Sequence, residues 1–157
     1  MRIERVHRDP DGSVTELFVQ YRHFYDRRGE DAAARAFFRA RLDAGDSLIW
    51  AARVDNRVDG FTQVYVEHSS LRLGTDWILN DLFVVPESRG TGAGRALVQR
   101  VLDDAATAGV ATVRLETQHD NRVARALYDD LGFVVRPTVP DTGEFVTYER
   151  RISPRTG

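Results

Sequence analysis

Apolar residues recur along this chain with two different periods, and the period changes at glycines, prolines and polar turns. Segments that alternate or are rich in β-branched and aromatic residues predict strands over residues 2–7, 47–54, 58–67 and 77–85. Apolar residues at every third or fourth position predict helices that begin near residues 13, 31 and 93. The chain is therefore predicted to start with one strand, two helices and three strands, followed by a helix.

Short sequence signals mark the ends of the two N-terminal helices. Ser13 and Glu16 have the spacing of a capping box, so the first helix is predicted to begin at Ser13 and to end at Gly29. Asp31 is predicted to cap the second helix, and Gly45 to end it. Both helices carry an apolar stripe, so both are expected to pack on the sheet.

The C-terminal half predicts a strand–helix–strand unit and two closing strands. A fifth strand is predicted over residues 111–115, and the helix before it makes the fourth and fifth strands parallel neighbours. Apolar residues at helical spacing predict a further helix that Gly132 ends, and closing strands over residues 133–135 and 144–152. A chain of 157 residues with this pattern is expected to form one domain, residues 1–157, of the α+β class.

The segment Trp77–Ala96 joins a strand to a helix through a glycine-rich turn. Pro86 ends the strand, because it has no N–H for the sheet. The turn lies before the helix N-terminus, where unpaired N–H groups and the helix dipole attract anions. Arg89 adds a permanent cation. A phosphate or pyrophosphate is expected to bind here; the alternative is a tight turn without a ligand.

The spacing of the glycines argues against two common nucleotide motifs. Gly90, Gly92 and Gly94 follow the pattern G-x-G-x-G, whereas the dinucleotide-binding fingerprint is G-x-G-x-x-G. A P-loop has Lys and then Ser or Thr after its last glycine, and this chain has Arg95 and Ala96 there. A nucleotide-binding protein therefore remains only as an alternative.

Two motifs resemble the GCN5-related N-acetyltransferase (GNAT) superfamily. The run Arg89-Gly90-Thr91-Gly92-Ala93-Gly94 is similar to its acyl-CoA loop, (Arg/Gln)-x-x-Gly-x-(Gly/Ala). The block that runs from Asn121 through Ala124, Leu127 and Tyr128 to Leu131-Gly132-Phe133 is similar to its second motif. The resemblance implies the GNAT fold, in which helices flank a mixed, mostly antiparallel sheet and the parallel fourth and fifth strands splay apart. It also implies acetyl-CoA as the donor and a primary amine as the usual acceptor.

The resemblance assigns residues of the fourth strand, the glycine turn and the second motif to acyl-CoA. They are Leu82, Phe83, Val84, Arg89, Gly90, Thr91, Gly92, Ala93, Gly94, Arg95, Asn121 and Tyr128. A backbone N–H near Phe83 or Val84 could stabilise the tetrahedral oxyanion. Asn121 is expected to bind the pantetheine amides, or alternatively only to cap its helix. Tyr128 is the candidate acid for the departing thiolate, because members of the family carry a tyrosine there; the alternative is a ring packed on the sheet.

The candidate acceptor residues lie on the first helix and the fourth strand. The superfamily usually forms one wall of the acceptor cleft from its two N-terminal helices, which nominates Tyr21 and Tyr25, with His23 as a further candidate. Asn80 and Asp81 complete the set. Polyamine acetyltransferases of the superfamily look similar here but carry Glu in place of Asn80, so the resemblance does not extend to polyamine specificity. The alternative for the helix residues is core packing or solvated surface.

An attacking amine must lose a proton, either directly or through water. Asp81 and Glu116 are the candidate general bases. Asp81 could equally attract a cationic amine, or serve only as an acceptor for a neighbouring backbone N–H. No base is singled out by the sequence.

Composition narrows the remaining alternatives. A net charge of −2 and a pI near 6.1 argue against a nucleic-acid partner. The absence of cysteine excludes a thiol nucleophile, so direct transfer in a ternary complex is expected, without a metal. No apolar run approaches the roughly 20 residues of a membrane span, and no secretory leader is recognised, so a cytoplasmic protein is expected. A homodimer through the closing strands is also predicted. Another acyl-CoA donor, or a non-catalytic acyl-CoA-binding or sensing module, is the alternative function.

Overall fold

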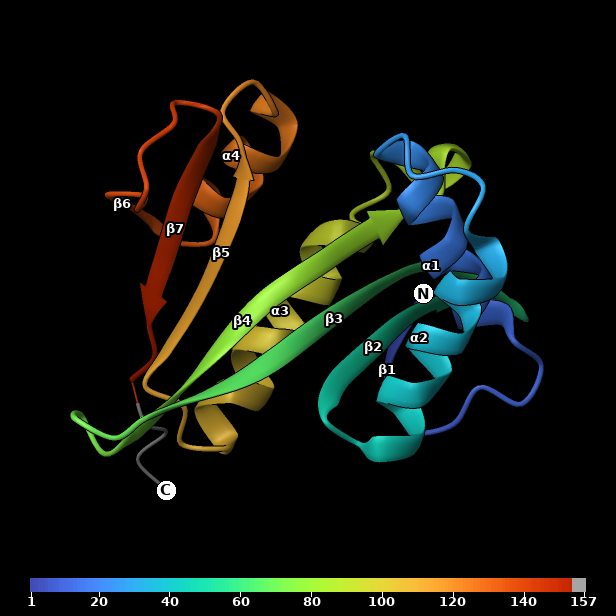
Figure 1. The fold of residues 1–157 in the computed structure, drawn as a ribbon, viewed down its shortest axis with the longest axis horizontal. Coiled ribbons are helices and arrows are strands. Elements are labelled where there is room, and N and C mark those ends of the chain that lie inside the picture. The colour runs from blue at the N-terminus through green and yellow to red at the C-terminus, as the bar shows by residue number, and fades with distance from the viewer. Residues whose placement is uncertain (154–157) are drawn as a thin grey trace. The chain divides into compact units, whose positions relative to one another are not determined.

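The structure is a computed structural model that describes residues 1–153 (Figure 1). Within these residues the helices are α1 (Ser13–Phe24), α2 (Asp31–Ala44), α3 (Ala93–Thr107) and α4 (Arg122–Asp130), with a 3₁₀ turn η1 (Pro86–Ser88). The strands are β1 (Arg2–Val6), β2 (Ser47–Val54), β3 (Arg57–Ser69), β4 (Gly74–Val84), β5 (Thr112–Gln118), β6 (Val134–Arg136) and β7 (Phe145–Arg151). Among the described residues, none of the helices has the length and apolar character required to cross a membrane.

The strands form one mixed sheet in the order β1-β2-β3-β4-β5-β7-β6. β1, β2 and β3 pair antiparallel, as do β5, β7 and β6. β4 and β5 pair parallel over Asp76–Ile78 and Thr112–Arg114, because α3 carries the chain from one strand to the next. The predicted α+β fold, with a parallel fourth and fifth strand in a mixed sheet flanked by helices, is confirmed.

The chain divides into two compact units. One consists of Met1–Tyr65 and Asp81–Arg100, and the other of Val66–Asn80 and Val101–Gly157. The first unit has a core in which Phe18, Phe38 and Phe61 pack together, with ring centroids 4.9–6.3 Å apart. The second unit buries the apolar residues of β5, the end of α3 and the rings of Tyr128 and Tyr148.

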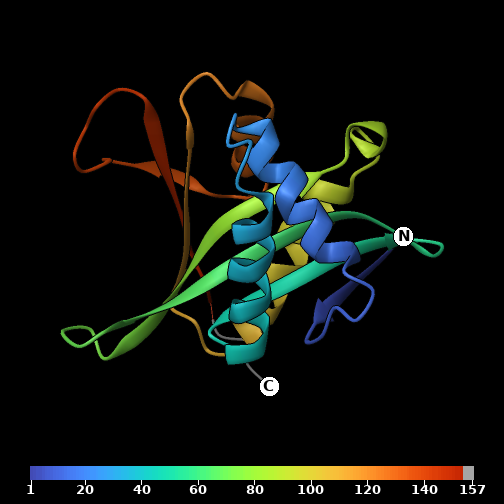
Figure 2. The same cartoon turned by 45° about the vertical axis from the view of Figure 1, so that its right-hand side comes forward.

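In the first unit, the helices lie on opposite faces of β3. Phe61 points toward α1 and α2, where it meets Phe18 and Phe38. Gly60, one residue earlier, lies on the opposite face of the strand. A Cβ added there would stand 3.3 Å from Leu97 of α3. Figures 1 and 2 show the same arrangement, with α1 and α2 in front of β3 and the start of α3 behind it.

A β-carbon at Gly60 would also stand 2.9 Å from the backbone oxygen of Phe83, which is closer than real contacts allow. A glycine within a strand permits a close backbone approach of this kind. Gly60 allows β3 to lie against the end of β4, the part of the chain that leads into the glycine turn.

The N-terminus of α1 differs from the prediction, although the helix does begin at Ser13. Its N-cap residue is Gly12, and no side chain of the Ser13–Glu16 pair makes the capping hydrogen bond. The carboxylate of Asp9 instead accepts hydrogen bonds from the N–H groups of Val14 and Thr15, at 3.2 and 2.8 Å. Glu16 pairs with Arg35 of α2 at 2.6 Å. The capping-box prediction is wrong, because acids upstream of the helix reach its first turn.

The predicted C-terminal end is wrong for α1 and right for α2. α1 ends at Phe24, five residues before Gly29, whereas Gly45 ends α2 in the left-handed conformation, as predicted. Asp31 is the first residue of α2 rather than its cap, and its carboxylate lies 2.7 Å from Nε2 of His23. His23 therefore contacts the start of α2.

Candidate functional site

The glycine turn, Arg89–Gly94, has the geometry predicted for an anion site at the start of α3. The first intrahelical hydrogen bond runs from the N–H of Ala96 to the oxygen of Gly92 at 2.9 Å, so the N–H groups of Ala93 and Gly94 precede it and point out of the helix end. Gly90 and Gly92 have φ values of 80° and 90°, which side chains rarely adopt. In the described part of the chain, no atom lies within 4 Å of a Cβ at either glycine. The space outside the turn is open to a ligand.

Arg89 lies at the start of this turn and is bound to the end of β4. Its Nε donates to the oxygen of Val84 at 3.1 Å. The guanidinium carbon stands 5.1 Å from the ring centre of Phe24 and 5.9 Å from that of Phe83, within the range of a cation–π contact. The cation is thereby held where the strand ends and the turn begins.

The β4 residues that the sequence assigned to acyl-CoA alternate between the two faces of the strand. Phe83 is buried on the side of α1, with its ring centroid 6.4 Å from that of Tyr21. Leu82 and Val84 are half-buried, and Val84 lies on the α3 side, close to Gly60. This segment leads directly into the glycine turn. At its end, Val85 donates its N–H to the backbone oxygen of Asp59 at 2.9 Å.

Asp81 is a buried carboxylate in a polar network between α1 and the strands. Only 4% of its surface is exposed, and its Oδ2 accepts a hydrogen bond from Nε2 of Gln63 at 2.6 Å. Gln63 in turn accepts one from the hydroxyl of Ser47 at 2.9 Å. The Asp81 backbone oxygen accepts a further bond from the hydroxyl of Thr62 at 2.7 Å. A buried charge requires such partners, and β2 and β3 supply them.

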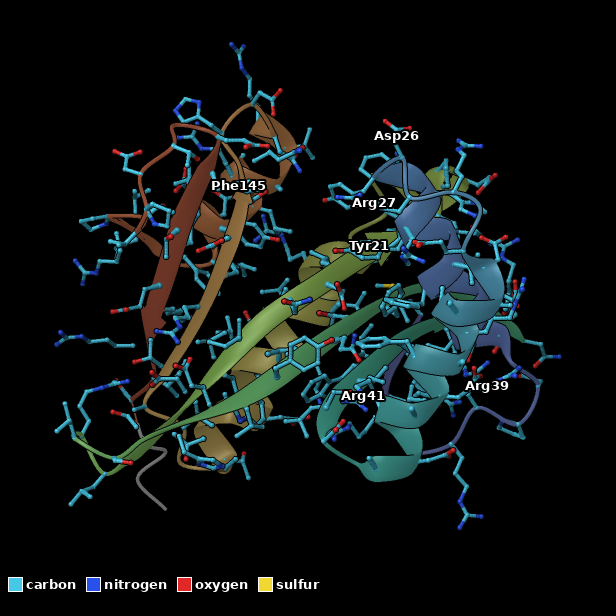
Figure 3. The ribbon with its side chains drawn as sticks, in the orientation of Figure 1. Tyr21, Asp26, Arg27, Arg39, Arg41 and Phe145 are labelled. Atoms are coloured by element: carbon cyan, nitrogen blue, oxygen red, sulfur yellow. The ribbon has the colours of Figure 1, made fainter. Side chains whose placement is uncertain are left out.

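Three tyrosines surround this carboxylate. Tyr21 lies beside Asp81, and burial together with the negative charge of Asp81 raises the pKa of its phenol well above the ordinary value. Burial, and after it the charge of Asp81, also raises the pKa of Tyr25, and that of Tyr65 to about 12. Figure 3 shows Tyr21 on the side of α1 that faces the end of β4. The structure thus brings together the predicted residues Tyr21, Tyr25 and Asp81.

Other predicted site residues are placed differently. Asn80 is exposed, because the strand turns alternate side chains to opposite faces and Asp81 takes the α1 side. Glu116 is exposed on β5, opposite Thr147 of β7, and belongs to the second unit. His23 contacts Asp31 of α2. Of the acids considered as bases, Asp81 is the one that lies among the tyrosines.

Asn121 caps α4. Its Oδ1 accepts a hydrogen bond from the N–H of Ala124 at 3.2 Å, which is the capping role given as its alternative. The cap uses the oxygen of the side chain, whereas binding of a pantetheine carbonyl would use its Nδ2 donors. The pantetheine role stays a prediction.

Tyr128 is the fully buried residue of α4, with 5% of its surface exposed. Its ring centre lies 5.7 Å from those of Phe133 and Tyr148. Leu127, the apolar residue before it, is only half-buried. The ring packing given as the alternative role of Tyr128 is therefore present, and its role as an acid stays a prediction.

Sequence reasoning missed Ser47, Gln63 and Tyr65. Thr62 and Gln63 are polar residues between the apolar Phe61 and Val64, which is the one signal that a buried polar network was present. The partners of Gln63 could not be named without the register that pairs Ser47 with Tyr65 and Ile49 with Gln63.

Comparisons with known proteins agree with this arrangement. The model of the acetyltransferase (GNAT) family matches residues 13–133. An uncharacterized N-acetyltransferase of Bacillus subtilis, YhfO, is 39% identical over 148 residues, which cover 94% of this chain and 95% of that protein. The [ribosomal protein bS18]-alanine N-acetyltransferase of Escherichia coli is 42% identical over 55 residues, 35% of this chain and 37% of that protein. The crystal structure of a probable acetyltransferase matches with a TM-score of 0.81 and 33% identity, covering 87% of this chain and 92% of that one.

Proposed function

This chain belongs to the acetyltransferase (GNAT) family and is an acyl-CoA-dependent N-acetyltransferase, and we propose that it transfers the acetyl group of acetyl-CoA to a primary amine by direct attack. The observation that carries the proposal is the family match over residues 13–133, which includes both the glycine turn and the buried carboxylate Asp81.

The donor half of the proposal assigns the pyrophosphate of acetyl-CoA to the glycine turn. The helix dipole and the outward N–H groups at the start of α3 favour an anion there, and Arg89 adds a full positive charge. The open space at Gly90 and Gly92 lets phosphate oxygens approach the backbone. Backbone groups of Leu82, Phe83 and Val84, on the strand that enters the turn, are proposed to face the pantetheine arm and the acetyl carbonyl.

The acceptor half assigns the amine to Asp81 and the tyrosines around it. A primary amine arrives as an ammonium ion at neutral pH, and a buried carboxylate next to aromatic rings favours a cation by charge and by cation–π attraction. Tyr25 is 40% exposed and marks the side from which the amine would enter. Gln63 holds the carboxylate in place for it by its hydrogen bond, and Tyr21 lies beside that carboxylate.

Attack then forms a bond between the amine nitrogen and the acetyl carbon, and the bond from that carbon to the CoA sulfur breaks. Before the attack, the ammonium loses a proton to a base, Asp81 or Glu116, through water, because only the neutral amine is a nucleophile. When the amide forms, the nitrogen loses its second proton to water. The departing thiolate takes a proton, for which Tyr128 remains the proposed donor, and the Tyr128 phenolate regains one from water. The chain has no cysteine to carry an acetyl intermediate, so the proposal has a single transfer step in a ternary complex.

The identity of the amine is the open part of the proposal. The name of the E. coli relative designates the alanine amino group of a ribosomal protein as the acceptor of that enzyme, over a match of 55 residues. A protein N-terminus is therefore a second candidate beside a small amine. A donor with a longer acyl chain, or binding of acyl-CoA without transfer, would be the outcome if acetyl-CoA supports no turnover.

The test is release of the CoA thiol from acetyl-CoA in the presence of a panel of amines and of peptides with a free N-terminal alanine. For an accepted amine, Asp81→Asn should raise the KM of the amine by about tenfold or more, because a charge-assisted contact is lost, and leave the KM of acetyl-CoA unchanged. Asp129→Asn, at an exposed position of α4, is the matched control for the loss of one negative charge. Binding of CoA without thiol release on any acceptor would favour the binding-module alternative.

A further inference from the structure

A second buried carboxylate lies directly behind the glycine turn. Asp59 is on β3, and only 1% of its surface is exposed. Its backbone oxygen accepts the N–H of Val85 at 2.9 Å, where the chain leaves β4. Aspartate is almost never fully buried unless it is paired, so the partners of this side chain indicate its role.

Those partners come from the turn and from the start of the same strand. Oδ2 of Asp59 accepts a hydrogen bond from the hydroxyl of Ser88 at 2.6 Å and from Nη2 of Arg57 at 3.0 Å. Oδ1 accepts a second bond from Arg57, through Nε at 2.5 Å. The bonds from Arg57 and Ser88 lower the pKa of Asp59 in spite of its burial, so the group is a carboxylate at neutral pH. Arg57, Asp59 and Ser88 are called the Asp59 clamp below.

Ser88 passes this anchorage on to the glycine turn. Its backbone oxygen accepts the hydroxyl of Thr91 at 2.6 Å and the N–H of Thr91 at 3.4 Å. Thr91 stands between Gly90 and Gly92, the two residues with positive φ. A continuous series of hydrogen bonds therefore connects a buried group of the sheet to the middle of the turn.

We infer that the Asp59 clamp positions the glycine turn for the pyrophosphate of acyl-CoA. Gly90 and Gly92 allow the conformation that the turn requires, but glycine does not select it, because it has no side chain to restrict the backbone. Ser88 and Thr91 select this conformation of the turn. The carboxylate of Asp59 holds the Ser88 hydroxyl, and the backbone oxygen of Ser88 holds Thr91. The Asp59 carboxylate can accept hydrogen bonds from Ser88 and Arg57 at once, but its negative charge alone would repel a phosphate. The bidentate pair with the Arg57 guanidinium offsets that charge.

The inference rests on the proposed function, because it requires acyl-CoA at this turn. It assigns a positioning role only: the carboxylate and the hydroxyl face each other behind the turn, and neither is proposed to contact the ligand. Removing the clamp should therefore loosen the turn and weaken the hold on the pyrophosphate, without affecting the transfer of the acetyl group itself.

Two donors that differ in the pyrophosphate separate this role from general stabilisation. S-acetylpantetheine carries the thioester and the pantetheine arm but no pyrophosphate or nucleotide. Ser88→Ala is expected to raise the KM of acetyl-CoA by about tenfold, the effect of losing one hydrogen bond to a charged group, with kcat within twofold. The kcat/KM for S-acetylpantetheine should stay within about twofold of the wild type.

Three further variants sharpen the comparison. Ser88→Thr keeps the hydroxyl and should restore the KM of acetyl-CoA. Asp59→Asn should raise the KM of acetyl-CoA as Ser88→Ala does. The double variant should have a KM no higher than that of the single variant with the higher KM, because both changes break the same connection. Glu87→Gln, at an exposed position of η1, is the control and should leave the kinetics with both donors unchanged.

Calorimetry with CoA gives a readout that does not depend on turnover. Weaker CoA binding by Ser88→Ala and Asp59→Asn, with S-acetylpantetheine kinetics preserved, supports the clamp. Equal losses with both donors show a merely structural role, and no loss with either shows that the turn holds itself; both results overturn the inference and leave the proposed function standing. A wild-type protein that neither binds CoA nor transfers acetyl groups removes the proposed function, and the inference with it.

Discussion

The phenol of Tyr21 on α1 lies beside the carboxylate of Asp81 on β4, and burial together with that negative charge raises the pKa of the phenol. The negative charge of Asp81 opposes ionisation of the phenol, because a second negative charge beside the first is unfavourable. The pair also lies where α1, a helix assigned to the amine, meets the strand that leads into the glycine turn.

This relationship predicts a delayed titration of tyrosine. In the folded protein the pKa of Tyr21 and Tyr25 is raised, and that of Tyr65 is about 12, whereas an unfolded chain releases these protons near pH 10. The folded state therefore binds more protons above pH 10, and its free energy of unfolding should fall as the pH rises from about 10 through 12.

Phenolate absorbance of native and denatured protein measures this titration. Asp81→Asn removes the negative charge but not the burial, so the late-titrating fraction should shift to lower pH without returning to the value in the denatured chain. Identical titration curves for the wild type and Asp81→Asn would show that the carboxylate does not act on these phenols.

Arg89→Ala should weaken acetyl-CoA binding and leave the fold intact. The loss of one charge-assisted phosphate contact should cost about 1.5–3 kcal/mol, measured by calorimetry with CoA. Arg89→Lys keeps the charge and should recover part of the affinity. Arg2→Ala, an exposed cation on β1, controls for net charge. Unchanged affinity in Arg89→Ala would place the pyrophosphate elsewhere.

Tyr128→Phe tests whether the buried ring also acts as an acid. The variant deletes only the hydroxyl, so the contacts with Phe133 and Tyr148 and the affinity for CoA should remain. If Tyr128 protonates the thiolate, kcat should fall by about 10²–10⁴-fold, with an equal fall in kcat/KM. Wild-type turnover would leave Tyr128 with the packing role that its ring contacts already support.

Gly60→Ala should destabilise the protein, because the new methyl group would meet the backbone oxygen of Phe83 at 2.9 Å. Overpacking of this kind costs roughly 1–3 kcal/mol, which urea unfolding can measure. Gly74→Ala is the matched control at another strand glycine, where the nearest atoms would stand 3.8–4.0 Å away. The contact would prove tolerable if both variants unfolded at the wild-type urea concentration.

A homodimer remains predicted, now through β6. The closing strand β7 lies between β5 and β6, so β6 is the edge of the sheet on this side, and Val134 and Val135 on it are 49% and 53% exposed. Light scattering should give about twice the 17.8 kDa of one chain, and Val135→Lys should reduce it. Val123→Lys, at an exposed position of α4, is the control. A wild-type protein that is monomeric at every concentration would rule the dimer out.

Features that depend on neighbouring residues were predictable from the sequence. The turn from Pro86 to Gly94 and the cap of α4 by Asn121 follow from local geometry, and the order of strands and helices follows from periodicity. The cap of α1 was mispredicted because Ser13 and Glu16 match a local motif, while Asp9 and Asp11 reach the helix from the preceding turn.

The buried polar partners required information that the sequence does not contain. Asp81 was visible as a candidate, but its connection to Gln63 and Ser47 depends on strand register and on which face each strand turns to α1. The same limit applies to Asp59 and Ser88, which are 29 positions apart in the chain. Tyr128 could be placed on its helix, but whether its side chain or that of Leu127 faced inward was decided by packing in three dimensions.

The opposite placement of the helices about β3 has a consequence for enzyme engineering. Phe61, Gln63 and Tyr65 face the helices assigned to the amine, whereas Gly60 faces α3, which begins at the turn assigned to the donor. A library confined to Tyr25, the exposed ring directly after α1, would vary the acceptor wall without altering the opposite face of the strand. Such a scaffold could be selected for new amines while a single, unchanged thioester serves every member of the library.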